Sequence, residues 1–176
     1  MKKFTALILV FGMLFAMTAC GGSNEVDDNK LSQEQDEITE DFAIPLGDTG
    51  VKVAIPAEMG FERYESELND FYGGGPNGEW RIIVNAEPKS DYADCTLADY
   101  ASLSAKANNG ESAQDADGNY YFTYTNAVSP GEVYKFYTAV REGADKYYRV
   151  AFYCFSEFWD NYSGKFSEWA TTIVVE

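Results

Sequence analysis

The sequence contains no histidine among its 176 residues. Histidine is the usual general base near neutral pH and a common zinc ligand, so its absence excludes Ser-His-Asp and Cys-His nucleophiles and histidine-containing zinc sites. The sequence also lacks a P-loop and a GxSxG motif, and its glycine-rich stretch at 73–78 precedes a predicted strand instead of a helix. We therefore expect a non-enzymatic protein with no cofactor and no metal, and a hairpin turn at 73–78.

Basic residues are scarce. The 13 Lys and Arg residues stand against 29 Asp and Glu residues, which gives a formal net charge of −16. Nucleic acids and anionic lipid head groups attract basic surfaces and repel acidic ones. The charge excludes nucleic acid as an expected partner and favours solubility.

Long apolar runs are missing, except near the N-terminus. After Lys2 and Lys3, residues 4–17 carry no charge and are mostly apolar. As a helix they would be about 21 Å long, which is shorter than the ~30 Å hydrocarbon core of a bilayer. A basic start, a short apolar run and small residues are typical of a signal peptide. We predict a signal peptide over residues 1–19.

The end of this run, Met17-Thr18-Ala19-Cys20, resembles the lipobox of bacterial lipoproteins, although Leu is more usual than Met at its first position. The resemblance implies that Cys20 is lipidated and holds the protein on the extracytoplasmic face of the cell membrane. Gly21-Gly22-Ser23 is typical of lipoproteins from Gram-positive bacteria. Two acyl chains anchor a protein stably. The alternative is a secretory peptide cleaved nearby, with Cys20 incidental.

Residues 20–41 are rich in acids and contain no aromatic residue; Lys30 is their only basic residue. Such a segment buries too little apolar surface to offset the entropy lost on ordering. We predict a flexible acidic tether over 20–41, followed by one globular domain over 42–176.

Alternating apolar and polar residues predict strands in the first half of this domain. Residues 42–56 indicate a hairpin around Gly47-Asp48-Thr49-Gly50. Residues 69–88 indicate strand, turn and strand. The second of these strands places one set of side chains on a common face: Trp80, Ile82, Val84 and Ala86.

Three aromatic-rich stretches, 119–126, 132–140 and 146–155, predict a three-stranded antiparallel meander. We expect one group of tyrosines to face away from the phenylalanines: Tyr121, Tyr137, Tyr147 and Tyr153.

Two segments have helical periodicity. In residues 96–110, Thr96 and Asp99 form a capping box, and the predicted apolar side comprises Leu97, Tyr100, Ala101 and Leu103. The last helix has Ser156 as its predicted N-cap. Its apolar residues recur at steps of three and four, which makes one stripe that suits packing on a sheet: Trp159, Tyr162, Phe166, Trp169 and Ile173.

This order of elements resembles the PsbP-like family over nearly all of residues 42–176. The residues that carry the resemblance are VKVAIPAEMGF at 51–61 and YYRVAFYCFSEFWDNYSGKFSEWATTIVV at 147–175. The resemblance implies an α+β fold, an antiparallel sheet flanked by helices in an α/β/α sandwich. It also implies a non-catalytic protein that binds and assists other proteins, but no binding residue carries over.

Cys95 is predicted at a helix entrance and Cys154 in a core-facing strand. They would lie in facing layers, and an extracytoplasmic location permits a disulfide. The alternative is two buried free thiols. The sequence leaves both open.

The sequence supports two function hypotheses. The first is a lipid-anchored protein that binds or assists another envelope protein. The second is a surface module that captures a glycan or solute through exposed aromatics, since 13 Tyr and 12 Phe exceed the needs of a modest core. The contacts we predict for either are Tyr72, Trp80 and the loop 73–78, at the end of a hairpin.

Overall fold

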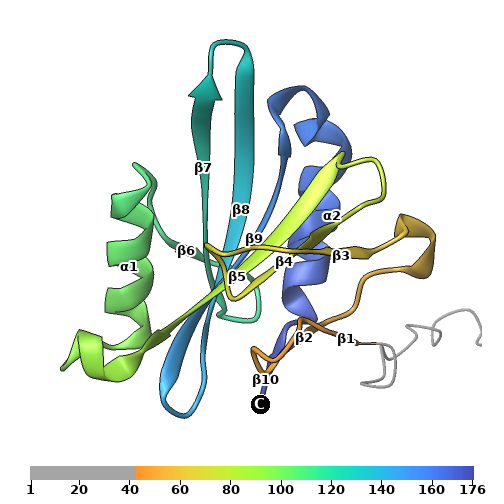
Figure 1. Ribbon diagram of the computed structural model, residues 1–176. Helices are drawn as coiled ribbons and strands as arrows, with labels where there is room; N and C mark the ends of the chain where they lie inside the picture. The colour runs from red at the N-terminus through yellow and green to blue at the C-terminus, as the bar shows by residue number, and fades with distance from the viewer. Residues whose placement is uncertain (1–42) are drawn as a thin grey trace, which may run out of the picture. The chain divides into compact units, whose positions relative to one another are not determined.

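The computed structural model describes residues 43–176 (Figure 1). The predicted signal peptide, the lipid attachment at Cys20 and the acidic tether lie outside the described residues. No helix within 43–176 is long and apolar enough to cross a membrane.

Two antiparallel sheets form the framework of the domain (Figure 1). The small sheet has the order β1-β2-β10, with β1 Ile44–Pro45, β2 Val51–Val53 and β10 Val174–Val175. The large sheet has the order β3-β4-β5-β9-β8-β7-β6. Its strands are β3 Glu62–Tyr64, β4 Phe71–Gly74, β5 Trp80–Pro88, β6 Ala113–Gln114, β7 Tyr120–Ser129, β8 Glu132–Glu142 and β9 Lys146–Phe155. The predicted hairpins and the predicted meander are therefore confirmed.

Helix α1, Leu97–Ala107, begins with the predicted capping box, in which Thr96 and Asp99 bond each other's backbone. It packs against β7 and β8. Leu103 is 50% exposed, so its predicted place in the core is wrong. The buried side of the helix includes Ser104 and Ala105 instead, because these follow Tyr100 and Ala101 by four residues and share their face.

Helix α2, Trp159–Thr171, packs against β8 and β9. Ser156 does not cap it, because Ser156–Phe158 forms a separate 3-10 turn before the helix. Two further 3-10 turns, Ala57–Met59 and Lys89–Tyr92, lie in connections. The predicted apolar stripe is confirmed for Tyr162, Phe166, Trp169 and Ile173, which are buried, while Trp159 is partly buried.

The two helices pack on different cores. The α2 core joins α2, the small sheet and one face of the large sheet, with Trp80, Phe152 and Trp169 at its centre. The α1 core is smaller and contains Tyr100, Phe122, Val140 and Tyr147. Successive side chains of β8 point into different cores, since Ala139 belongs to the α2 core and Val140 to the α1 core. The sheet therefore lies between two helical layers, as the α/β/α sandwich predicts.

Candidate functional site

Helix α1 covers only part of its face of the sheet. Its core is centred on Phe122, Val140 and Tyr147. Further along the same face, towards the β7–β8 hairpin and the strands β3–β5, most side chains are only half-buried. We call this area the open face and define it by six half-buried residues and one buried residue, Phe136, that lies between the rings of two of them: Tyr72, Arg81, Tyr124, Tyr134, Phe136, Tyr153 and Phe155. Large aromatic side chains that solvent reaches in a group are typical of interaction surfaces.

The strand register aligns one row of these residues across the sheet. Arg81 pairs with Tyr153, Tyr153 with Phe136, and Phe136 with Tyr124. The rings of Tyr153 and Phe136 stack with centroids 4.6 Å apart and an interplanar angle of 17°. Those of Phe136 and Tyr124 stack at 4.4 Å and 8°. Beside this row, Tyr134 stacks on Phe155 at 4.4 Å.

This stacking decides which parts of the rings meet solvent. Phe136 has a ring against each of its faces, and Tyr124 has Phe136 on one side and Phe122 5.8 Å away at 28°. The ring faces of Phe136 and Tyr124 are therefore used within the protein. The ring edges, which carry the positive part of the aromatic quadrupole, and the tyrosine hydroxyls are the parts available to a ligand.

Arg81 ends the aromatic row and has no acidic ion-pair partner within the described part of the chain. Its Nη1 donates a hydrogen bond to the Tyr72 hydroxyl, and its Nε is buried without a partner. No carboxylate among residues 43–176 forms an ion pair with Arg81. Burial acts to lower the pKa of Arg81, but the hydrogen bond with Tyr72 and the nearby Tyr153 and Tyr134 outweigh it, so the pKa is raised and the guanidinium stays charged.

Of the two predicted contact residues, the structure leaves one accessible. Tyr72 is half-buried in β4 and lies on the open face. Trp80 is 1% exposed, so its prediction as a surface contact is wrong. Its ring packs in the α2 core, 4.9 Å from that of Trp169. The hairpin position suggested exposure, whereas alternation along β5 points this side chain inward with Ile82 and Val84.

Half of the predicted contact loop at 73–78 is also inaccessible. Gly73 and Gly74 belong to β4, and both are buried together with Gly75. A Cβ atom on Gly75 would lie 2.6 Å from Trp80 Nε1, so glycine is required where the backbone crosses the tryptophan ring. Pro76 and Asn77 are the exposed part of this turn.

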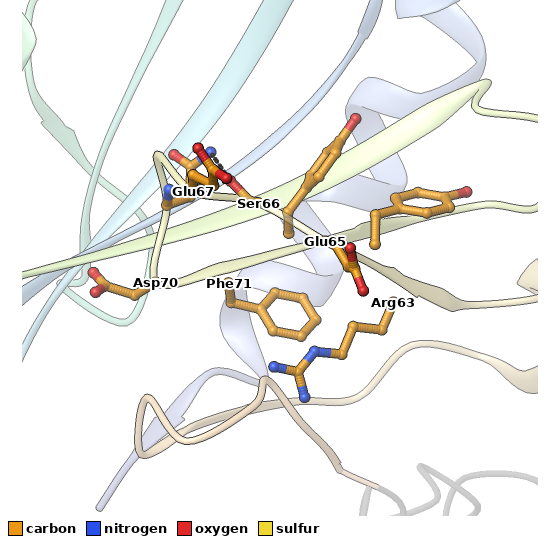
Figure 2. A pocket seen from close by; sticks show the side chains of 9 residues that line it. Arg63, Glu65, Ser66, Glu67, Asp70 and Phe71 are labelled. Carbon is orange, nitrogen blue, oxygen red and sulfur yellow. Dashed lines mark hydrogen bonds between the residues drawn. The ribbon is translucent and has the colours of Figure 1, made fainter.

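A hollow of about 580 Å³ lies around the connection between β3 and β4 (Figure 2). Arg63 extends towards Phe71, with its guanidinium carbon 5.6 Å from the ring centroid, and Glu65 and Glu67 lie along the rim. Asp70 accepts a hydrogen bond of 2.7 Å from the Ala86 backbone amide, which ties the connection to β5. No group of acids or cysteines within 43–176 is arranged to hold a metal ion.

The structure does not bring Cys95 and Cys154 together. Both are free thiols. Cys154 is buried in the α2 core. Cys95 precedes α1 on the other side of the sheet, where its carbonyl accepts a hydrogen bond of 2.6 Å from Tyr147, a residue of the α1 core. The sheet separates the two side chains, so the disulfide expectation does not hold in this fold.

The two thiols should differ in reactivity. Burial raises the pKa of the Cys154 thiol to about 11, so almost none of it is thiolate near neutral pH. We expect iodoacetamide at pH 7.5 to modify Cys95 and leave Cys154 unmodified, as measured by peptide mass mapping. In denaturant both should react, which serves as the control. Equal modification of Cys154 in the folded protein would contradict its placement in the core.

The predicted tyrosine grouping is also corrected. Tyr121 and Tyr137 stack on each other at 5.0 Å and belong to the α2 side with Phe152. Tyr147 packs with Phe122 in the α1 core, and Tyr153 stacks on Phe136. The alternation of side chains along each single strand agrees with the prediction. The register in which the strands pair, however, decides which side chains of different strands share a face of the sheet.

Comparison with known proteins supports the fold. The solution structure of cyanobacterial PsbP (CyanoP) from Synechocystis sp. PCC 6803 matches with a TM-score of 0.52 and 15% identity, over 76% of this chain and 91% of that chain. The chain has a PsbP-like fold. A crystal structure from Bacteroides thetaiotaomicron VPI-5482 matches with a TM-score of 0.51 and 11% identity, over 72% of this chain and 45% of that chain.

Identities this low establish a shared fold and nothing about activity. No protein-family model matches the sequence. No curated protein matches it either. The function is therefore argued from the residues of the open face.

Proposed function

We propose that this PsbP-like chain is a lipid-anchored extracytoplasmic protein that binds another protein of the cell envelope through its open face. The observation that carries the proposal is the group of half-buried aromatic residues outside the α1 core, Tyr72, Tyr134, Tyr153 and Phe155. Tyrosine and arginine are the residues most enriched at the energetic centres of protein interfaces. The open face supplies both on a rigid sheet, where binding does not require ordering a loop.

The geometry favours a protein over a glycan as the partner. A sugar ring usually packs on the exposed face of an aromatic ring. On the open face, Tyr124 and Phe136 already use their ring faces for stacking on neighbours. Ring edges and hydroxyls suit the mixed apolar and hydrogen-bonding surface of a protein partner.

Site-specific cross-linking tests this surface. A photoreactive benzoylphenylalanine at Phe155, which is half-exposed on the open face, should link to one envelope protein in intact cells. The matched control is the same group at Leu103, which is 50% exposed on α1. We expect the partner band from position 155 only. Equal linking from both positions, or no linking from position 155, contradicts the proposal.

The anchor has its own test. Cys20→Ala should move the protein from the membrane fraction to the medium or leave the precursor uncleaved, because the acyl chains supply the stable attachment. Fractionation and metabolic labelling with palmitate measure both effects. Cys95→Ala is the matched control and should change neither. Labelling that persists in the Cys20→Ala protein contradicts lipidation at this residue.

The non-enzymatic part of the proposal is supported by the absence of histidine from the sequence and of a nucleophile motif. The purified protein should not turn over ester, glycoside or peptide substrates. A turnover that disappears on substitution of a single Asp, Glu or Ser would show that the protein is an enzyme.

A further inference from the structure

The charge distribution on the open face indicates what the partner presents to it. The protein as a whole is strongly acidic, with a formal net charge of −16. The aromatic row nevertheless ends at a cation, Arg81, which pairs with no acid among residues 43–176. Some other cations of the domain do form ion pairs, as Arg149 does with Glu87 and Lys89 with Glu142. An arginine without a counter-charge on an interaction surface is a ready partner for an external anion.

Arg81 is half-buried, so part of its side chain meets solvent. Its neighbour on β4 is Gly74, which has no side chain. A Cβ atom there would lie 2.4 Å from the Trp80 carbonyl oxygen and 3.0 Å from the Arg81 Cα atom, so only glycine fits this position. Beyond Gly74, the next residue in the same row is Glu62 on β3. The Arg81 Cγ atom would lie 3.3 Å from that Cβ atom, so the arginine side chain itself lies over the buried Gly74, with Glu62 on the far side of the glycine.

Neutral donors extend the positive character of this area. The hydroxyl of Tyr72 accepts a hydrogen bond from Arg81 and is also hydrogen-bonded with Tyr153, which links the three side chains. Tyr153 and Tyr134 lie close enough to Arg81 to interact with it electrostatically. The ring edges of the aromatic row carry the positive part of the quadrupole. A guanidinium, phenolic hydroxyls and ring edges together match a carboxylate that is flanked by apolar groups.

We infer that Arg81, Tyr72 and Tyr153 form a carboxylate-binding site, which receives an aspartate, a glutamate or a C-terminal carboxylate of the partner protein. The planar guanidinium binds a carboxylate through parallel hydrogen bonds. The row from Tyr153 to Tyr124 contacts the apolar residues beside that carboxylate. This inference rests on the proposed function and adds the chemistry of the partner to it.

The test compares two probe peptides that differ only in charge at one position, Ac-Phe-Glu-Phe-amide and Ac-Phe-Gln-Phe-amide. Binding to the full chain is followed by NMR, from the Arg81 side-chain N–H signal and the aromatic ring signals. A charge-assisted hydrogen bond should make the Glu peptide bind roughly tenfold more tightly or better. Equal affinities, or no change in the Arg81 signal with either peptide, overturn the inference.

Variants identify the residue responsible. Arg81→Met keeps an unbranched apolar stem and removes the charge, so this variant should bind the Glu and Gln peptides with about equal affinity. Lys106→Met, on the exposed surface of α1, changes the net charge equally and should keep the preference. Glu62→Gln removes the acid in the row and should strengthen binding of the Glu peptide. A preference that survives in Arg81→Met overturns the inference.

The outcomes separate this inference from the proposed function. If both peptides shift the aromatic signals of the open face equally, the face binds polypeptide without a carboxylate site and the proposed function stands. If both peptides shift signals elsewhere and position 155 gives no cross-link, the proposed function fails as well.

Because Arg81 is half-buried, the thermal unfolding midpoint of Arg81→Met is measured alongside. If that variant is unfolded, Tyr72→Phe, which should weaken the preference severalfold, takes its place.

Discussion

Replacing Trp169 with alanine is expected to lower the free energy of unfolding by about 3–5 kcal/mol, because a large buried side chain is removed from a well-packed core. Trp169 is 2% exposed, and its ring lies 4.9 Å from that of Trp80 and 5.9 Å from that of Phe152. It therefore joins α2 to both β5 and β9. Since domains are typically stable by about 5–15 kcal/mol, this single change removes a large share of the total.

Urea denaturation followed by tyrosine fluorescence and circular dichroism measures this loss. The matched control is Leu103→Ala, which also truncates a large apolar side chain, but one that is 50% exposed on α1. We expect the control to change the free energy of unfolding by less than about 0.5 kcal/mol. A loss below about 1 kcal/mol for Trp169→Ala would mean that α2 does not pack on the sheet as described.

Replacing Gly74 with alanine is expected to destabilise the protein by about 1–3 kcal/mol or more, although it adds only one methyl group. The added Cβ would lie 2.4 Å from the Trp80 carbonyl oxygen, which is backbone and belongs to the paired strand β5. No side-chain rotation relieves that contact, so β4 and β5 must separate locally. Thermal unfolding by circular dichroism should show a lower midpoint.

Gly164→Ala provides the opposite case within the same protein. Gly164 lies within α2, and a Cβ there would meet nothing within 4 Å. Alanine should stabilise the helix by about 0.5–1 kcal/mol, because glycine loses more backbone entropy on folding. The two glycine substitutions should therefore move the midpoint in opposite directions. A rise for Gly74→Ala would show that β4 and β5 are not paired at this register.

Local patterns predicted most elements of the fold. The capping box of Thr96 and Asp99 was predicted because it depends on residues three apart in one helix turn. The stripe of Phe166 and Trp169 was predicted because helical periodicity is itself a local property. Strand alternation around Ile82 and Val84 was predicted for the same reason.

The candidate site was predicted only in part, because it depends on contacts between distant residues. The sequence indicates Tyr72 but carries no signal for Arg81, since one arginine in a strand has no distinguishing local pattern. Its significance arises from three facts of the folded chain: Tyr153 lies opposite it, its Nη1 donates a hydrogen bond to Tyr72, and no described acid pairs with it. The free cysteines follow the same rule, because only the sheet between them shows that they are apart.

The sequence by itself determined the order of strands and helices, their amphipathic faces, the excess of acid and the absence of histidine chemistry, because each of these is a property of composition or of near neighbours. The tertiary structure decided which faces coincide. The register of β5, β9, β8 and β7 aligned Arg81, Tyr153, Phe136 and Tyr124 in one row. The position of α1 over β7 and β8 left that row uncovered. Both depend on pairings between residues far apart in the chain, and a one-residue change in register would have moved the same side chains to the opposite face.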